Sequence, residues 1–93
     1  MPALVRIETT RGGVLERKQR SLNNLCMLAA LNRPAEFELH FRGALRNGCS
    51  VEEIKETLLQ IGIYCGVPAA VEAFRIGKRV MDELAAAEAS GDD

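Results

Sequence analysis

The sequence is poor in aromatic residues and in the side chains that bind metals. Its 93 residues include no Trp, one Tyr (Tyr64) and one His (His40), and aromatic residues make up 4% of the chain. The three cysteines, Cys26, Cys49 and Cys65, are an odd number and form no CxxC pair. A single His gives no Cys/His cluster for structural zinc, and this cysteine pattern disfavours a disulfide scaffold. We therefore expect no metal site and reduced thiols that mostly serve packing.

Charge and hydropathy exclude further classes of protein. Twelve Lys and Arg against thirteen Asp and Glu give a net charge of −1. That balance offers no electrostatic footprint for nucleic acid or an anionic membrane. No apolar run approaches the roughly 18 residues of a membrane-spanning helix, and the first residues do not resemble a signal peptide. We expect a single cytoplasmic domain over residues 1–93.

The spacing of apolar residues predicts helices after an extended arm over residues 1–14. A first helix runs to about residue 31, because Leu22, Leu25 and Ala29 recur at spacings of three and four. Pro34 ends that helix and suits the first turn of the next. The second helix stops at Asn47-Gly48, with four residues on its apolar face: Phe37, Phe41, Ala44 and Leu45.

A third helix begins at Val51, because Ser50 and Glu53 have the spacing of a capping box. It is apolar on two sides. One side carries Ile54, Leu58, Ile61 and Cys65, and the nearly opposite side carries Leu59 and Ile63. Such a helix is buried on both sides, so we place it at the centre of the fold or at a subunit contact.

A fourth helix follows Gly66-Val67-Pro68, and its tail, residues 85–93, is expected to fray. The apolar side expected for it consists of Ala70, Phe74, Gly77, Met81 and Leu84. Strands alternating with helices are not indicated. The prediction is a small all-α domain of four to five helices with short connections.

Four side chains are candidates for chemistry, each with a simpler alternative. His40 lies toward the apolar side of its helix, either as a hydrogen-bonded residue at the edge of the core or as a proton donor or anion-binding group. Glu56, Gln60 and Tyr64 follow each other at four-residue spacing, and Glu56 is either solvated or a partly buried acid–base group. Tyr64 more often packs than reacts. Cys65, on the core-facing side, is expected to be inert.

The chain resembles the carboxymuconolactone decarboxylase family, within the alkylhydroperoxidase D-like superfamily. The matching stretches include Arg20-Ser21-Leu22, Glu38-Leu39-His40-Phe41-Arg42, Glu53-Ile54-Lys55-Glu56 and Tyr64-Cys65-Gly66-Val67-Pro68. The resemblance implies a helical unit built around a central hairpin and assembled into a ring, commonly a hexamer, with a trimer as the alternative. It also implies cofactor-free loss of CO2 from 4-carboxymuconolactone, giving β-ketoadipate enol-lactone in protocatechuate catabolism.

The family reaction suggests a role for each candidate residue. His40 and Arg42 would recognise a carboxylate or an oxyanion, Glu56 and Tyr64 would handle protons, and Gln60 would donate a hydrogen bond to the lactone. Neither a metal nor an organic cofactor is implied. The expected partners are a small lactone acid and further copies of the chain.

Two departures from the family pattern leave alternatives open. Family decarboxylases usually begin with a further helical segment and a Trp-rich stretch, so a shortened N-terminus is expected here. The redox branch carries Cys-x-x-Cys and a His, where this chain reads Pro68-Ala69-Ala70-Val71. A non-catalytic or repurposed helical oligomer that binds a small molecule is therefore the first alternative. A peroxidase of the alkylhydroperoxidase D type is the second, and it is disfavoured.

Overall fold

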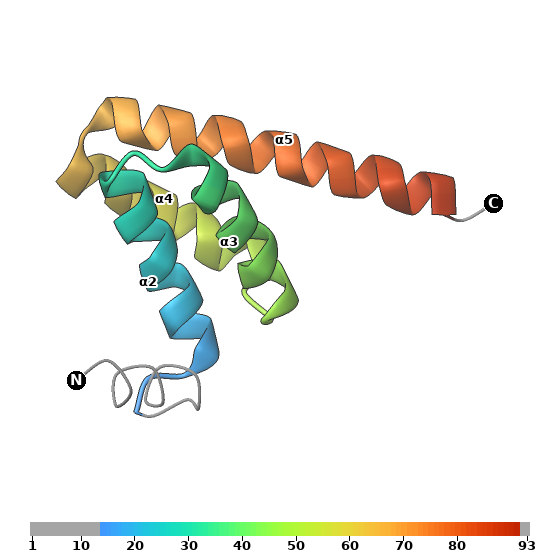
Figure 1. The fold of residues 1–93 in the computed structure, drawn as a ribbon, viewed down its shortest axis with the longest axis horizontal. Helices are drawn as coiled ribbons and strands as arrows, with labels where there is room; N and C mark the ends of the chain where they lie inside the picture. Colours follow the sequence, from blue (N-terminus) through green and yellow to red (C-terminus); the bar gives the residue numbers. More distant parts are fainter. Residues whose placement is uncertain (1–13, 92–93) are drawn as a thin grey trace.

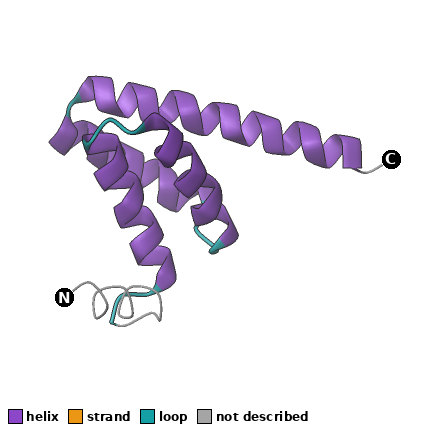
Figure 2. Cartoon of the chain, in the orientation of Figure 1, coloured by secondary structure: helices purple, strands orange, loops and turns teal. Residues whose placement is uncertain are grey.

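A computed structural model describes residues 14–91 and consists there of α-helices joined by short connections (Figure 1). In chain order the helices are α2 (Arg17–Ala30), α3 (Pro34–Arg46), α4 (Val51–Cys65) and α5 (Val67–Gly91). No strand occurs in this described part (Figure 2), which confirms the all-α prediction. Nearly all of the arm predicted over residues 1–14 lies outside the described residues.

Local signals explain where the first two helices start and stop. Glu16 and Gln19 form a capping box at the start of α2. Asn32 has a φ of 58°, in the left-handed region that Asn tolerates better than most residues. The chain therefore turns sharply there, and Pro34 occupies the first helical position of α3. Both predicted boundaries are confirmed.

The third helix begins with the predicted capping box. The backbone N–H of Glu53 donates to Ser50 Oγ over 3.0 Å, and the backbone N–H of Ser50 donates to Glu53 Oε1 over 2.8 Å. Gly66, with a φ of 101°, supplies the turn between α4 and α5. This connection is short enough to keep α4 and α5 in contact along their lengths.

The helices α2 and α3 form an antiparallel hairpin, and α4 packs against α2 and crosses behind it in Figure 1. A salt bridge of 3.2 Å between Lys18 and Glu53 joins the first turns of α2 and α4. The long α5 packs against α3 and α4 and extends beyond both (Figure 1). The described residues therefore form a small helical bundle from which α5 projects.

The apolar faces predicted for the first three helices form the core. Fully or almost fully buried side chains include Leu25, Phe37, Phe41, Ile54, Leu58 and Ile61. The prediction that Cys65 belongs to this face is wrong. Cys65 is exposed because α4 ends there and the chain turns away at Gly66.

The core face predicted for α5 needs a correction. Ala70 and Gly77 are buried as expected, but Phe74 and Leu84 remain 38% and 40% exposed. The residues that complete the buried stripe of α5 are Ala73, Ile76 and Val80. The physical reason is close approach: a Cβ on Gly77 would lie 2.9 Å from Cε2 of Phe41. The side of α5 that contains Gly77 therefore packs closely against the bundle, and the larger Phe74 and Leu84 side chains lie at the edge of this contact.

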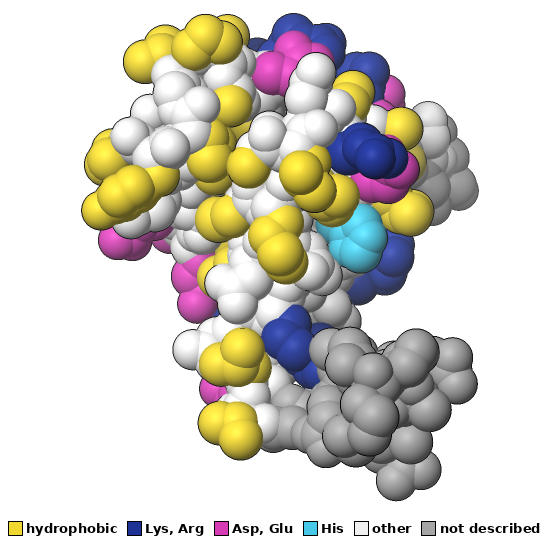
Figure 3. All heavy atoms as spheres, turned by 60° about the vertical axis from the view of Figure 1, so that its left-hand side comes forward, with side chains coloured by type: hydrophobic (Ala, Val, Ile, Leu, Met, Phe, Trp, Pro, Cys, Tyr) yellow, Lys and Arg dark blue, Asp and Glu magenta, His cyan; other side chains and the backbone are white. Residues whose placement is uncertain are grey.

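The second apolar face of α4 is open to solvent in the single chain. Leu59 and Ile63 are 61% and 72% exposed, so a position at the centre of the fold is excluded and the subunit contact stays a prediction. Glu56, Gln60 and Tyr64, expected to be partly buried, are also exposed. Yellow hydrophobic side chains recur across the face drawn in Figure 3.

The remaining expectations concern the tail and the surroundings of the chain. α5 is helical through Gly91 with exposed side chains beyond Met81, and fraying there stays a prediction. Among residues 14–91, no helix is both long and apolar enough to cross a bilayer. The same residues contain no cluster of three or more potential metal ligands.

Candidate functional site

Three of the predicted site residues, His40, Glu56 and Gln60, line two surface hollows that flank α2. The first, which we call the α2–α3 hollow, has a volume of about 670 Å³. Its polar lining consists of Arg17, Arg20, Ser21, Asn23, Asn24, His40 and Asn47. Leu15 and Met27 add apolar surface. Among residues 14–91, no Asp or Glu is part of this lining, although the chain as a whole carries more acids than bases.

The helical spacing of α2 gives this hollow its polar wall. Arg17, Arg20 and Asn24 are three and four residues apart, so they share one side of the helix. Asn47, at the end of α3, donates from Nδ2 to Oγ of the buried Ser21 over 2.8 Å. This hydrogen bond ties the two helices together beside the hollow.

His40 contributes to the opposite wall from the middle of α3. Its side chain is half-buried and makes no hydrogen bond or ion pair within the described residues. No fully buried side-chain nitrogen in that part of the chain lacks a partner, so the ring nitrogens of His40 remain accessible. The simpler expectation, a hydrogen-bonded histidine at the core edge, is not what the structure contains. Figure 3 shows the histidine at the surface with basic side chains on the same face.

Glu56 and Gln60 line the second hollow, between α2 and α4, with a volume of about 620 Å³. Glu53 also lines it. The backbone N–H of Ser50 and the ammonium of Lys18 lower the pKa of the Glu53 carboxyl below its usual 4.5. This hollow is therefore acidic where the α2–α3 hollow is basic. Asn23 on α2 lines both hollows, so α2 lies between them.

Tyr64 and Arg42 lie outside both hollows. Tyr64 is 78% exposed. The Arg42 guanidinium donates to Glu38 and Glu83, and these hydrogen bonds raise its pKa above the usual value for arginine. Arg79 on α5 also donates a hydrogen bond to Glu38 on α3, so a second interaction joins these two helices. Within one chain, then, Glu56 and Gln60 come together, while His40, Tyr64 and Arg42 each lie elsewhere.

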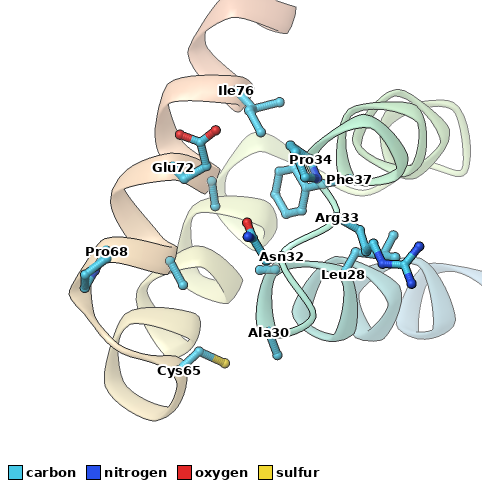
Figure 4. A pocket seen from close by; sticks show the side chains of 13 residues that line it. Leu28, Ala30, Asn32, Arg33, Pro34, Phe37, Cys65, Pro68, Glu72 and Ile76 are labelled. Atoms are coloured by element: carbon cyan, nitrogen blue, oxygen red, sulfur yellow. The ribbon is translucent and has the colours of Figure 1, made fainter.

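Cys65 lines a third cavity, of about 360 Å³, at the end of the bundle where two turns meet (Figure 4). Asn32 enters it from the α2–α3 turn and Glu72 from α5. Glu72 is held by Arg75 over 2.6 Å. Burial raises the pKa of the Cys26 thiol above 9.0, with Cys65 as a second cause. That shift is the opposite of what a nucleophilic thiolate at Cys26 would require.

Sequence reasoning missed the polar wall of α2. The helical spacing of Arg17, Arg20 and Asn24 was a readable signal. However, the same spacing occurs on any solvated helix face, and only the packing of α3 turns it into one side of a hollow.

Comparison with known proteins supports the family suggested by the sequence. The sequence model of the carboxymuconolactone decarboxylase family matches residues 3–79. Over 70 residues, 75% of this chain, the sequence is 37% identical to nitrosuccinic acid decarboxylase npaB of Metarhizium robertsii and covers 49% of it. It is 36% identical, also over 70 residues and 75% of this chain, to 4-carboxymuconolactone decarboxylase of Acinetobacter baylyi, and covers 52% of it.

The chain thus spans about half the length of the curated relatives it matches. The matched range of the family model includes all of α2, α3 and α4 and both hollows beside α2. The all-helical fold and this match agree, and the chain belongs to the carboxymuconolactone decarboxylase family.

Proposed function

We propose that this chain, as a homo-oligomer, removes CO₂ from a small dicarboxylic acid without a metal or organic cofactor. The specific reaction proposed is that of 4-carboxymuconolactone to β-ketoadipate enol-lactone in protocatechuate catabolism. The observation that carries the proposal is the α2–α3 hollow, in which His40 and Arg17 line opposite walls and the described residues of the lining include no Asp or Glu. Such a lining suits an anionic substrate and a developing oxyanion.

The substrate itself can accept the electrons that CO₂ leaves behind. When the C–CO₂⁻ bond breaks, its electron pair moves through the conjugated C=C into the lactone carbonyl, which becomes an oxyanion. The double bond shifts, and a proton then adds to the carbon next to that carbonyl. The protein must therefore bind the carboxylates, stabilise the oxyanion with hydrogen-bond donors and deliver one proton.

His40 is the group we assign to the oxyanion or to proton delivery, because its ring nitrogens are accessible in the cationic hollow. Glu56 and Tyr64 remain proposed proton-handling groups, and Gln60 a proposed donor to the lactone. Arg42 fits substrate binding less well, because Glu38 and Glu83 already accept its hydrogen bonds.

A second copy of the chain would bring these groups together. His40 and the Glu56–Gln60 pair line different hollows of one chain. Leu59 and Ile63 expose apolar surface on the helix that carries Glu56. Burying that surface against another copy is favourable, and it would carry α4 side chains of one copy to a site on another. We therefore propose that the complete site forms at a subunit contact.

The test is CO₂ release from 4-carboxymuconolactone by the purified oligomer, compared with His40→Gln. We expect turnover by the wild-type chain and a fall of about 100-fold or more in kcat for the variant, the size typical for a lost acid–base group. Arg75→Gln, on the exposed side of α5, serves as the matched control and should keep full activity. A well-folded oligomer that releases no CO₂ would contradict the proposal.

A non-catalytic oligomer that binds a small acid is the second candidate. It is favoured by the exposure of Tyr64 and Glu56 in the single chain, because a solvated carboxylate is a poor match for acid–base work at neutral pH. Saturable binding of 4-carboxymuconolactone without turnover would support this candidate over the decarboxylase.

A further inference from the structure

The two substrates named by the relatives share one skeleton. Nitrosuccinic acid and 4-carboxymuconolactone each carry two carboxyl groups on adjacent carbons, as succinate does. In each, the carbon that bears one carboxyl also bears an electron acceptor, a nitro group or an unsaturated lactone. Loss of that carboxyl as CO₂ leaves a –CH₂–COO⁻ arm intact in both products. A site for such substrates needs a fixed binding point for the arm that does not react.

The α2–α3 hollow has the charge and the donors for that arm. The two guanidinium groups that line it, on Arg17 and Arg20, stand one helical turn apart. Arg17 takes part in no ion pair within the described residues, so its donors are available to a ligand. Asn24 adds an amide on the same side of α2. Planar guanidinium groups and amide N–H groups bind carboxylates in a directional way.

The other polar hollow cannot serve as this binding point. Glu53 and Glu56 line it, and the low pKa of Glu53 keeps that carboxyl ionised at neutral pH. A substrate dianion would be repelled there. Repulsion from the acidic hollow therefore favours binding of the unreactive arm on the other side of α2, in the α2–α3 hollow that Arg17 lines.

We propose that the α2–α3 hollow binds the unreactive carboxymethyl arm of a 2-substituted succinate through Arg17, and thereby restricts the substrate to that class. This inference rests on the proposed decarboxylase function and adds to it both the class of substrate and a binding residue. His40, across the hollow, then lies on the side of the reacting carbon and its acceptor group. Leu15 and Met27 provide apolar contact for the substituent.

Methylsuccinate is the probe, because it has the skeleton but no acceptor group and cannot react. Its binding is followed by proton NMR. His40 is the only histidine and Tyr64 the only tyrosine in the sequence, so each gives its own ring resonances. We expect a saturable shift of the His40 resonances, because His40 lines the hollow. Butanoate, with one carboxylate, and glutarate, with a longer spacing, should bind at least about tenfold more weakly.

The decisive variant is Arg17→Gln, with Arg75→Gln as its control. Loss of a charge-assisted hydrogen bond predicts a dissociation constant for methylsuccinate about tenfold or more higher in Arg17→Gln. Arg75→Gln should bind as the wild type does. Equal binding by Arg17→Gln, equal binding of butanoate, or methylsuccinate binding without a shift of the His40 resonances would each overturn the inference.

Binding and turnover separate the two proposals. If methylsuccinate binds beside His40 and Arg17→Gln weakens it, but 4-carboxymuconolactone and nitrosuccinate release no CO₂, the dicarboxylate site stands and the decarboxylase function fails. If CO₂ is released and Arg17→Gln leaves KM unchanged, the function stands and the role of Arg17 is refuted.

Discussion

The amide nitrogen of Asn47 lies 2.8 Å from the hydroxyl oxygen of Ser21, and this hydrogen bond joins the end of α3 to the first half of α2. Ser21 is the one buried polar residue among residues 14–91, and 6% of its surface is exposed. Both residues line the α2–α3 hollow. The hydrogen bond therefore couples the stability of the helical hairpin to the shape of the proposed binding site.

Replacing Ser21 with Ala tests that coupling. The variant leaves the Asn47 amide without its acceptor, which should lower the free energy of unfolding by about 1–2 kcal/mol. Chemical denaturation measures this change. In a double-mutant cycle with Asn47→Ala, the second substitution should cost little once the first is present. Fully additive losses would show that the hydrogen bond contributes nothing of its own.

Glycine-to-alanine changes at two helical positions should have opposite effects. At Gly77 a new Cβ would meet the buried Phe41 ring at 2.9 Å, and overpacking should cost about 1–3 kcal/mol, more than the roughly 1 kcal/mol gained in helix propensity. At Gly43 the nearest atom is 3.9 Å away, at the end of the flexible Arg46 side chain. Gly43→Ala should therefore be stabilising. Thermal melts of both variants provide the comparison, and a more stable Gly77→Ala would show that α5 does not approach Phe41 this closely.

Acid should weaken the fold partly through Glu53. The bonds to Ser50 and Lys18 lower the pKa of this carboxyl in the folded chain, so the unfolded chain binds a proton first as the pH falls. The stabilisation by Glu53 is complete above about pH 4.5 and disappears as the pH falls through the lower folded-state pKa. The difference in Tm between the wild type and Glu53→Gln should thus be large at pH 7 and shrink below pH 4.5. A difference that does not change with pH would contradict this account.

The exposed apolar face of α4 should control assembly. Ile63→Glu places a charge where 72% of an isoleucine is exposed, and we expect it to shift the oligomer toward monomer in light-scattering chromatography. Ala85→Glu, an exposed position near the projecting end of α5, should not change the measured mass. A wild-type chain that is monomeric at micromolar concentration would refute the proposed subunit contact.

The helix boundaries were predictable because their signals are local. Pro34, the capping box of Ser50 and Glu53, and the turn at Gly66 each act within a few residues, and the structure uses all of them. The buried side of α5 was not predictable in the same way. Two overlapping apolar stripes share Gly77, and the burial of Ala73, Ile76 and Val80 rather than Phe74 depends on how α5 packs against α3 and α4.

The site was only partly predictable from sequence for a similar reason. His40 could be singled out because it is the only histidine, and Glu56 with Gln60 because of their spacing. Arg17 could not, since nothing local distinguishes it from a solvated arginine. The ion pair of Arg42 with Glu83 was equally hidden, because Glu83 is 41 residues away in the sequence.

The most direct test of the central claim is a kinetic comparison of CO₂ release from 4-carboxymuconolactone and from nitrosuccinate. We predict turnover of at least one of them by the wild-type oligomer, a higher KM with nearly unchanged kcat for Arg17→Gln, and a lower kcat for His40→Gln. The result that would contradict the claim is CO₂ release that neither substitution alters, or no release of CO₂ from either acid by a folded oligomer.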